Sequence, residues 1–186
     1  MKRFVLILAA FAACAFAPAE LTTGEIMEKI AGAKARKAVI DCGFKEVRTS
    51  PAGSEVKLDG RLVYKPDNYL SMEYSNGELF LIDGSRMTIR RDGKENVFDL
   101  DKNLMMKSLS HALLYSFRGT LVDLSVEQKT LINAVLKDGC YVVSLCATKP
   151  SARGYNRIDV YYDASTYAIK AMRMDEFSGA STYYSM

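Results

Sequence analysis

The 186-residue chain holds few side chains whose types and spacing could do chemistry. Hydrolysis by the common routes needs a Ser, His and Asp set on a G-x-S-x-G elbow, or an H-E-x-x-H zinc motif, and the sequence contains neither. It also contains no glycine-rich phosphate loop and no Cys-x-x-Cys pair. Four carboxylates lie near the ends of expected hairpins, namely Glu73, Glu78, Asp83 and Asp92. Carboxylates in such places are normally solvated, so they do not indicate a glycosidase pair. We therefore predict that the protein is not an enzyme and uses no cofactor.

Two features come close to a metal site without completing one. Residues with the spacing of the first half of a calcium loop are Asp99, Asp101 and Asn103. Such a loop needs glycine at its sixth position and glutamate at its twelfth, and this chain has Leu104 and Ser110 there. His111 is the one histidine, and it has no second His or Cys at ligand spacing. We expect no metal site, and we expect His111 at the surface or at the core boundary.

Methionine is the unusual apolar residue of this sequence, which contains nine of them. Met is flexible and polarisable, so it suits a surface that must accept ligands of variable shape, although an ordinary core also uses it. Composition alone leaves both interpretations open. The Met residues on expected apolar faces include Met72, Met87, Met105, Met106, Met172 and Met174.

Residues 54–91 predict the sheet that must position these side chains. Apolar residues at even numbers alternate with polar residues at odd numbers over 56–64 and again over 70–74, which is the period of a strand with one dry face. A type I′ hairpin turn needs positive φ at both central positions, which favours the dipeptides Asn76-Gly77, Asp83-Gly84 and Asp92-Gly93. The stretch therefore predicts an antiparallel meander of four strands.

Further strands complete a mainly β chain of about ten strands. We expect them at residues 38–50, 96–100, 131–136, 140–148, 155–162, 168–177 and 180–185. Residues 120–130 are the least readable part, and 125–128 allow the start of a short helix instead of a strand.

Two helices are expected. The first runs from Thr23 to about residue 36, because Thr22 and Glu25 form a capping box; its polar face, which includes Lys34, should be solvated. The second covers residues 104–117, where apolar residues recur at steps of three and four; Asp101 can cap its start and Gly119 can end it.

The first 19 residues predict a signal peptide rather than part of the fold. Two basic residues precede an uninterrupted apolar run of 13 at residues 4–16, and an alanine-rich cleavage site follows. A bilayer core needs ~20 apolar residues, so this run does not predict a transmembrane helix. The alternative is a lipid anchor at Cys14, although the motif around it is a poor one. We expect export to the periplasm and one domain over residues 20–186.

Charge and cysteine usage agree with an exported protein, which we expect to be a monomer. Without Lys2 and Arg3 of the signal peptide the chain has 23 basic and 22 acidic side chains, a net charge of +1. Near-neutral charge gives no support for nucleic-acid binding. The remaining cysteines are odd in number, and we interpret them as small buried hydrophobes: Cys42, Cys140 and Cys146. The last two lie ~20 Å apart on one expected strand and cannot bridge, whereas a bridge from Cys42 to either stays open.

Three separated segments carry a family resemblance. They are GRLVYKPDNYLSMEY from Gly60, LFLIDGSRM from Leu79 and IDVYYDASTYAIKAMRMDEFSGASTYY from Ile158. Their shared features are a glycine before a strand that ends in a basic residue and proline, a Leu-Ile-Asp-Gly turn, and a late strand pair. Together they resemble the LolA family of periplasmic lipoprotein carriers. Residues 120–136 contribute nothing to the resemblance.

The resemblance implies a mainly β (α+β) fold. A curved antiparallel sheet would form an unclosed β-barrel, with an N-terminal helix and an inserted helical lid or plug. Its concave face would hold the acyl chains of lipoproteins. An inner-membrane lipoprotein-releasing transporter would supply this cargo and an outer-membrane acceptor would receive it. The alternatives are a carrier of free lipid, a lipid-anchored acceptor of the same fold, or a cell-envelope interaction module with an ordinary packed core.

The resemblance also points to candidate site residues. We expect the acyl cavity to be lined by apolar residues of the meander: Leu58, Leu62, Tyr64, Leu70, Met72, Tyr74, Leu81 and Met87. Lys65 occupies the family's basic position before the proline, in a segment one residue shorter than usual. We expect the lid residues Leu109, Leu113 and Phe117 to fill the empty cavity and to leave it when cargo enters, with a flexible exit at Gly119.

Overall fold

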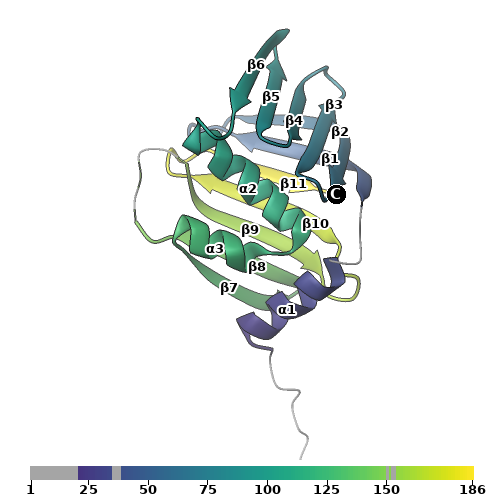
Figure 1. The fold of residues 1–186 in the computed structure, drawn as a ribbon, viewed down its shortest axis with the longest axis vertical. Coiled ribbons are helices and arrows are strands. Elements are labelled where there is room, and N and C mark those ends of the chain that lie inside the picture. Colours follow the sequence, from purple (N-terminus) through teal and green to yellow (C-terminus); the bar gives the residue numbers. More distant parts are fainter. Residues whose placement is uncertain (1–20, 35–38, 150, 152–153) are drawn as a thin grey trace, which may run out of the picture.

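The structure is a computed structural model that describes residues 21–34, 39–149, 151 and 154–186. The expected signal peptide and Cys14 lie outside these residues. Figure 1 shows one curved antiparallel sheet with three helices against it. The sheet has eleven strands in the order β6-β5-β4-β3-β2-β1-β11-β10-β9-β8-β7.

The strands form two meanders that meet at the pairing of β1 with β11. The first meander consists of β1 (Ile40–Thr49), β2 (Glu55–Lys65), β3 (Tyr69–Tyr74), β4 (Leu79–Asp83), β5 (Arg86–Arg91) and β6 (Lys94–Asp99). The second consists of β7 (Thr130–Lys137), β8 (Cys140–Ala147), β9 (Tyr155–Asp163), β10 (Ile169–Glu176) and β11 (Ser181–Ser185). In the part of the chain that is described, β6 and β7 form the two edges and do not pair. The expected unclosed barrel is therefore confirmed.

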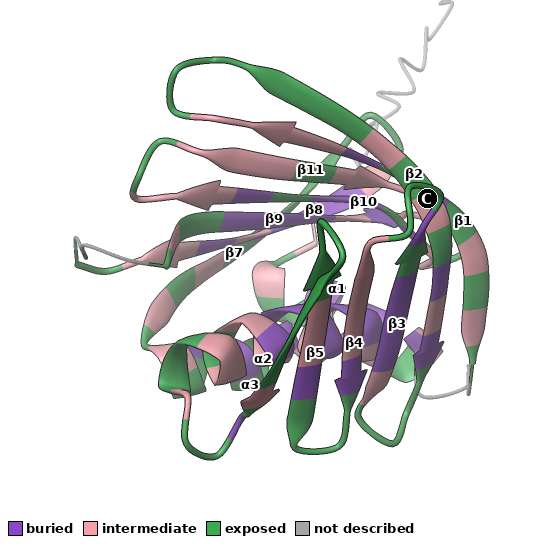
Figure 2. Cartoon of the chain, turned by 90° about the horizontal axis from the view of Figure 1, so that it is seen from above, coloured by how far each residue is buried: buried purple, intermediate pink, exposed green. Residues whose placement is uncertain are grey.

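The helices lie inside the bend of the sheet, as Figure 2 shows. They are α1 (Thr23–Lys34), α2 (Leu104–Arg118) and α3 (Leu121–Gln128). Because α2 and α3 connect β6 to β7, the helical segment joins the two open edges of the barrel. The residues that the helices cover are apolar and buried, including Tyr64, Met87, Val143, Tyr162, Met172 and Met174.

Helix α1 begins as expected, with a reciprocal cap. Thr22 Oγ1 accepts a hydrogen bond from the Glu25 amide at 3.3 Å, and Glu25 Oε2 accepts one from the Thr22 amide at 2.8 Å. The expectation of a solvated Lys34 is wrong, because α1 packs against α2 and this places the side chain inside. Lys34 Nζ lies 5.7 Å from the centroid of the Tyr162 ring.

Helix α2 starts at a different cap from the one expected. Asn103, not Asp101, caps it, because Asn103 Oδ1 accepts a hydrogen bond from the Met106 amide at 3.1 Å. The unassigned stretch after Gly119 is the short helix α3, which buries Leu121 and Leu124. Its eight residues leave too few apolar repeats for the periodicity to be read from the sequence. The chain thus has three helices in its described residues, where two were expected.

The hairpins confirm the expected meander, with changes at two of the three expected type I′ turns. Asp83 has no positive φ and belongs to β4, where it opposes Arg86, so the β4–β5 turn is Gly84-Ser85. Asp92 and Gly93 both have positive φ, at 53° and 69°, as a type I′ turn requires. At the β3–β4 hairpin Gly77 has positive φ but Asn76 does not. The loop there is one residue longer, with the Tyr74 amide donating to the Glu78 carbonyl at 3.0 Å. Glu78 therefore follows the turn directly, outside the strand.

Candidate ligand-binding site

The inner face of the first meander begins as an apolar row across four strands. Met72 lies opposite Leu62 on one side and Phe80 on the other, and Phe80 lies opposite Ile89. Side chains of directly opposed residues share one face of an antiparallel sheet, so these four point to the same side. Leu62 and Met72 are buried, whereas Phe80 and Ile89 are only partly covered. The row therefore runs from the closed core into an open part of the inner face.

A cavity of about 520 Å³ lies over this open part. Volumes of ~300–1,000 Å³ are typical of sites for small ligands. Helix α2 supplies one wall through Leu109 and Leu113, and β9 and β11 supply Tyr155 and Tyr184. The apolar residues contributed by the first meander are Val56, Met72, Leu79, Phe80 and Ile89.

The cavity lies where β3 ends and β2 continues alone. Tyr74, the last residue of β3, is opposite Gly60, and residues 55–59 of β2 pair with β1 but not with β3. The Phe44 ring packs closely at this point, because a Cβ on Gly60 would lie 2.9 Å from Phe44 Cε1 and 2.1 Å from the Glu73 carbonyl oxygen. Phe44 also meets Tyr74 edge to face at 5.1 Å. The two aromatic rings close the core, and the inner face beyond them is free to form the cavity.

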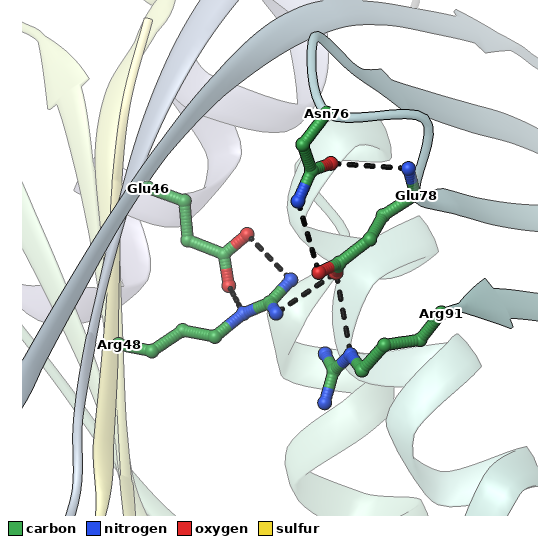
Figure 3. A network of polar contacts seen from close by, with 5 residues as sticks. All are labelled: Glu46, Arg48, Asn76, Glu78 and Arg91. Carbon is green, nitrogen blue, oxygen red and sulfur yellow. Dashed lines mark hydrogen bonds and ion pairs between the residues drawn. The ribbon is translucent and has the colours of Figure 1, made fainter. Parts of the chain in front are cut away.

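Four charged side chains form a network at one side of the cavity, as Figure 3 shows. We call Glu46, Arg48, Glu78 and Arg91 the cavity network. Arg48 Nε and Nη2 donate to the two oxygens of Glu46 at 2.6 and 3.2 Å, and Nη1 donates to Glu78 Oε2 at 2.9 Å. Arg91 Nε donates to the same Glu78 oxygen at 3.2 Å. The network therefore links β1, the β3–β4 loop and β5.

The turn before Glu78 holds its carboxylate in place. Asn76 Nδ2 donates to Glu78 Oε1 at 3.1 Å, and Asn76 Oδ1 accepts from the Glu78 amide at 3.0 Å. Burial by itself would raise the pKa of Glu78, but hydrogen bonds from Arg48 and Asn76 outweigh it and lower the pKa. Burial likewise opposes the charge of Arg48, yet its bonds to Glu46 and Glu78 raise the pKa of Arg48. The geometry keeps both groups charged.

Three tyrosines lie among these groups. The Arg48 guanidinium lies over the Tyr74 ring, 5.3 Å from its centroid. Burial raises the pKa of Tyr74 and of Tyr184, and it raises the pKa of Tyr155 to about 12. All three phenols therefore stay neutral at physiological pH.

Tyr155 reaches the cavity because β9 is irregular there. Arg157 opposes Asp175 and Tyr155 opposes Glu176, so the register against β10 shifts by one residue between them. A shift of one residue moves a side chain to the other face of the sheet. Simple alternation from Ile158 would have placed Tyr155 on the outer face, and the sequence carries no signal of the shift.

The expected cavity residues fall into three groups. Met72 and Tyr74 line the cavity. Four others lie on the same inner face but are buried in the core beside it: Leu62, Tyr64, Leu70 and Met87. Leu58 lies opposite Glu46 on the inner face and lines a separate cavity of about 660 Å³ with Phe44 and Met186.

Leu81 was expected to line the cavity, but it lies on the outer face of the sheet. It opposes Ser71 and Thr88, whereas the inner row passes through its neighbours Phe80 and Ile82. The error arose because β4 has apolar residues on both faces, which removes the alternation that marks the inner one. Lys65 is exposed at the end of β2, with Nζ 4.7 Å from the centroid of the Tyr69 ring, and does not line this cavity.

The three expected lid residues are also divided. Leu109 and Leu113 line the cavity, whereas Phe117 is buried and stacks on Tyr64 with ring centroids 5.3 Å apart. A flexible exit was expected at Gly119, but this residue is packed closely against α1. Gly119 has a φ of +75°, and a Cβ there would lie 2.9 Å from both Ile30 Cγ2 and Lys34 Cγ. Helix α1 therefore holds this end of α2.

Sequence reasoning missed the cavity network. The sequence of β1 does contain a signal for it. The inward-facing residues of this strand have even numbers, and after the apolar Cys42 and Phe44 the next two are the charged Glu46 and Arg48. Two charged residues that continue the inward side of a strand indicate a polar site inside the fold. Arg91 continues the inward positions of Ile89 in the same way.

The remaining groups singled out in the sequence lie away from the cavity. His111 is partly buried, and its Nδ1 lies 2.7 Å from Glu127 Oε1. The three described cysteines, Cys42, Cys140 and Cys146, are free thiols. Among the described residues, no helix combines the length and the apolar character needed to cross a membrane.

Comparison with known proteins gives structural neighbours only. No protein-family model matches the chain, and no curated protein matches it. A LolA superfamily protein from Nitrosomonas europaea is 10% identical, with a TM-score of 0.40, over 89% of this chain and 91% of that chain. An outer membrane lipoprotein-sorting protein domain from Vibrio parahaemolyticus is 11% identical, with a TM-score of 0.43, over 86% and 88%. The lipoprotein LppX of Mycobacterium tuberculosis is 9% identical, with a TM-score of 0.38, over 86% and 91%.

Proposed function

We propose that the protein is a carrier of the LolA type, which binds the acyl chains of lipoproteins on the inner face of its unclosed barrel. The observation that supports this is the open, largely apolar cavity over Met72, Phe80 and Ile89. A core that served stability alone would be closed by packing at this point. The proposed carrier performs no catalytic step and needs no cofactor.

The physical requirement on such a carrier is twofold. Burial of an acyl chain gains ~0.8 kcal/mol per CH₂ group, so a chain in water strongly favours an apolar cavity. Release requires that the cavity bind without tight shape specificity. Met72 and the partly covered Leu109 and Phe80 suit this role, because their side chains can repack around chains of different shape.

The proposed setting is the periplasm, after removal of the signal peptide expected at residues 1–19. The cargo would come from an inner-membrane lipoprotein-releasing transporter and pass to an outer-membrane acceptor. Both partners rest on the sequence resemblance alone. A second candidate is a carrier of free lipid, which the cavity network favours because a charged cluster beside an apolar cavity matches an amphiphile with a charged headgroup.

A pair of neighbouring substitutions tests the carrier proposal. Ile89 faces the cavity and Thr88 faces outward from the same strand, and both are partly buried. Ile89→Glu should abolish uptake of Nile red and of an acylated lipoprotein, since an unpaired charge in an apolar site costs several kcal/mol. Thr88→Glu is the matched control and should leave uptake unchanged. Met72 is less suitable, because its burial would make the same change a test of folding.

Native mass spectrometry of the protein released gently from membranes provides the second measurement. Bound lipid or lipoprotein would support a carrier. A mass without bound lipid, together with equal dye uptake by the Ile89→Glu and Thr88→Glu variants, would favour the cell-envelope interaction module instead.

A further inference from the structure

The cavity network is unusual because stability does not account for it. Ion pairs taken out of water lose much of their hydration, and well-packed apolar residues often replace them without loss of stability. The Glu46 side chain is 2% exposed, on an inner face whose other residues are mostly apolar. A charged group kept in such a place calls for another role, and recognition of a polar ligand group is the direct one.

Arg91 is the least tightly held member of the network. Glu46 and Arg48 hold each other through two parallel hydrogen bonds, which is the strongest geometry available to them. Arg91 is 52% exposed and, among the described residues, forms its one ion pair through Nε, to Glu78 at 3.2 Å. The other N–H groups of its guanidinium have no hydrogen-bond acceptor in the described part of the chain. Arg91 is therefore the residue that can accept a new anion most readily.

Glu78 Oε2 marks a position that suits an anionic oxygen. It lies 2.9 Å from Arg48 Nη1 and 3.2 Å from Arg91 Nε, so two guanidinium groups from different strands converge on one oxygen. Guanidinium groups bind carboxylate and phosphate oxygens with the same donor geometry. An anionic oxygen in this position would take over the hydrogen bonds from Arg48 and Arg91, and only the bond from Asn76 to Glu78 would be lost. Because Glu78 belongs to the β3–β4 loop and not to a strand, this movement of its side chain breaks no ladder.

The apolar side of the cavity begins next to this position. Glu78 and Arg91 line the same cavity as Phe80, Ile89 and Leu109. Phe80 follows Glu78 by two residues and Ile89 precedes Arg91 by two, so both apolar side chains share a face with the network. An amphiphile with its chain along this row has its head beside Arg48 and Arg91.

We propose that Arg48 and Arg91 form a subsite for the anionic headgroup of a lipid or fatty acid, whose phosphate or carboxylate oxygen displaces Glu78 Oε2. This inference rests on the proposed function, since it requires that the cavity take up an acyl chain. It adds a preference for anionic over neutral amphiphiles. In the absence of ligand, Glu78 neutralises the two guanidinium groups and keeps the subsite assembled.

The chain offers a matched pair of arginines for the test. Arg91 points inward to Glu78 and lines the cavity, whereas Arg61 of β2 points outward, forms an ion pair with Asp41 and does not line the cavity. The probes are lysophosphatidate, palmitate and uncharged monopalmitoylglycerol, all with a 16-carbon chain, measured by displacement of Nile red from the purified mature protein at physiological salt. We expect wild type to bind the two anionic probes more tightly than the neutral one.

Three variants then show which residues are responsible for the preference for anionic probes. Arg91→Gln should weaken binding of the anionic probes by about 10- to 100-fold, as for the loss of a hydrogen bond between charged groups, and should leave the neutral probe unchanged. Arg61→Gln should leave all three unchanged. Glu78→Gln should tighten binding of the anionic probes, because it removes the carboxylate that competes with them.

Each alternative outcome has its own meaning. Equal binding of anionic and neutral probes by wild type, or equal effects of Arg91→Gln and Arg61→Gln, overturns the subsite and leaves the carrier proposal standing. Failure of wild type to take up any of the three probes or the dye overturns both. Binding of lysophosphatidate without palmitate, or the reverse, supports the subsite and distinguishes a phosphate headgroup from a carboxylate.

Discussion

The two halves of helix α2 are held very differently. In the second half Phe117 is 2% exposed and stacks on Tyr64, and the Tyr162 hydroxyl donates to the Ser116 carbonyl at 2.7 Å. Arg118 adds hydrogen bonds to the Pro66 carbonyl and to Asn68. In the first half Leu104 is 79% exposed and Met105 is 47% exposed. One end of the helix belongs to the core and the other does not.

This difference redefines the lid hypothesis. A plug that leaves the cavity as a whole would have to break the contacts of Phe117, Ser116 and Arg118 together. Local opening is easiest where few apolar contacts and many exposed groups occur, which describes residues 104–109. We therefore restrict the lid hypothesis to this first half, with Leu109 as its residue in the cavity.

The largest expected effect comes from truncating one residue in each half. Phe117→Ala should lower the free energy of unfolding by about 3–5 kcal/mol, because it empties a fully buried ring site. Leu104→Ala should change it by less than about 0.5 kcal/mol, as for an exposed site. Urea denaturation followed by circular dichroism measures both. Similar losses in the two variants would show that α2 is held uniformly and would remove the basis for a lid at its start.

A smaller effect is expected at Gly119, where α1 meets the end of α2. Gly119→Ala places a side chain in left-handed backbone against Ile30 and Lys34, which should cost about 1–3 kcal/mol. Gly32→Ala is the control, since nothing lies within 4 Å of a Cβ at this exposed position of α1. It should stabilise the protein by up to about 1 kcal/mol. Thermal unfolding measures both variants. A shift of Tm in the same direction for Gly119→Ala and Gly32→Ala would contradict this account of the helix junction.

The smallest expected effect is a pH dependence at the cavity end. The pKa of Glu78 is lowered in the folded protein, so its contribution to stability is present above the ordinary pKa and is lost as pH falls through the folded value. After correction for the slower intrinsic exchange in acid, the protection factors of amides in β4 and the first half of α2 should therefore decrease as pH falls, while the second half of α2 stays protected. Glu78→Gln should remove part of this difference. An acid response that is equal in both halves would argue against a local role for Glu78.

Sequence patterns predicted the architecture where each element carries its own signal. The capping box at Thr22 and the hairpin signal at Asp92-Gly93 act through local hydrogen bonds and backbone dihedrals, so neighbouring residues suffice to read them. Alternation correctly placed Leu62, Tyr64, Leu70 and Met72 on one face. The unclosed sheet followed from the resemblance, not from any single pattern.

The site was predicted only in part, because its features depend on contacts between distant segments. Lys34 looks solvated until α1 is packed on α2, and Leu81 looks inward until the register of β4 is known. Tyr155 enters the cavity through a register shift that depends on β10. Glu46 and Arg48 follow the alternation of β1 and therefore point inward. Because charged residues normally lie on the solvent-exposed face, their charge predicts the opposite orientation.

The position of β11 within the sheet has a consequence for the order of folding. Its residues 181–185 pair with β1 on one side and β10 on the other, so the last strand lies at the centre of the sheet and joins the two meanders. Until these residues are available, each meander exposes an unpaired edge and the cavity lacks the wall that Tyr184 supplies. Pairing between the ends of a chain is slow, because a long loop must close before it forms. A chain that completes its sheet late remains extended for longer, which would suit the proposed export through a membrane before folding.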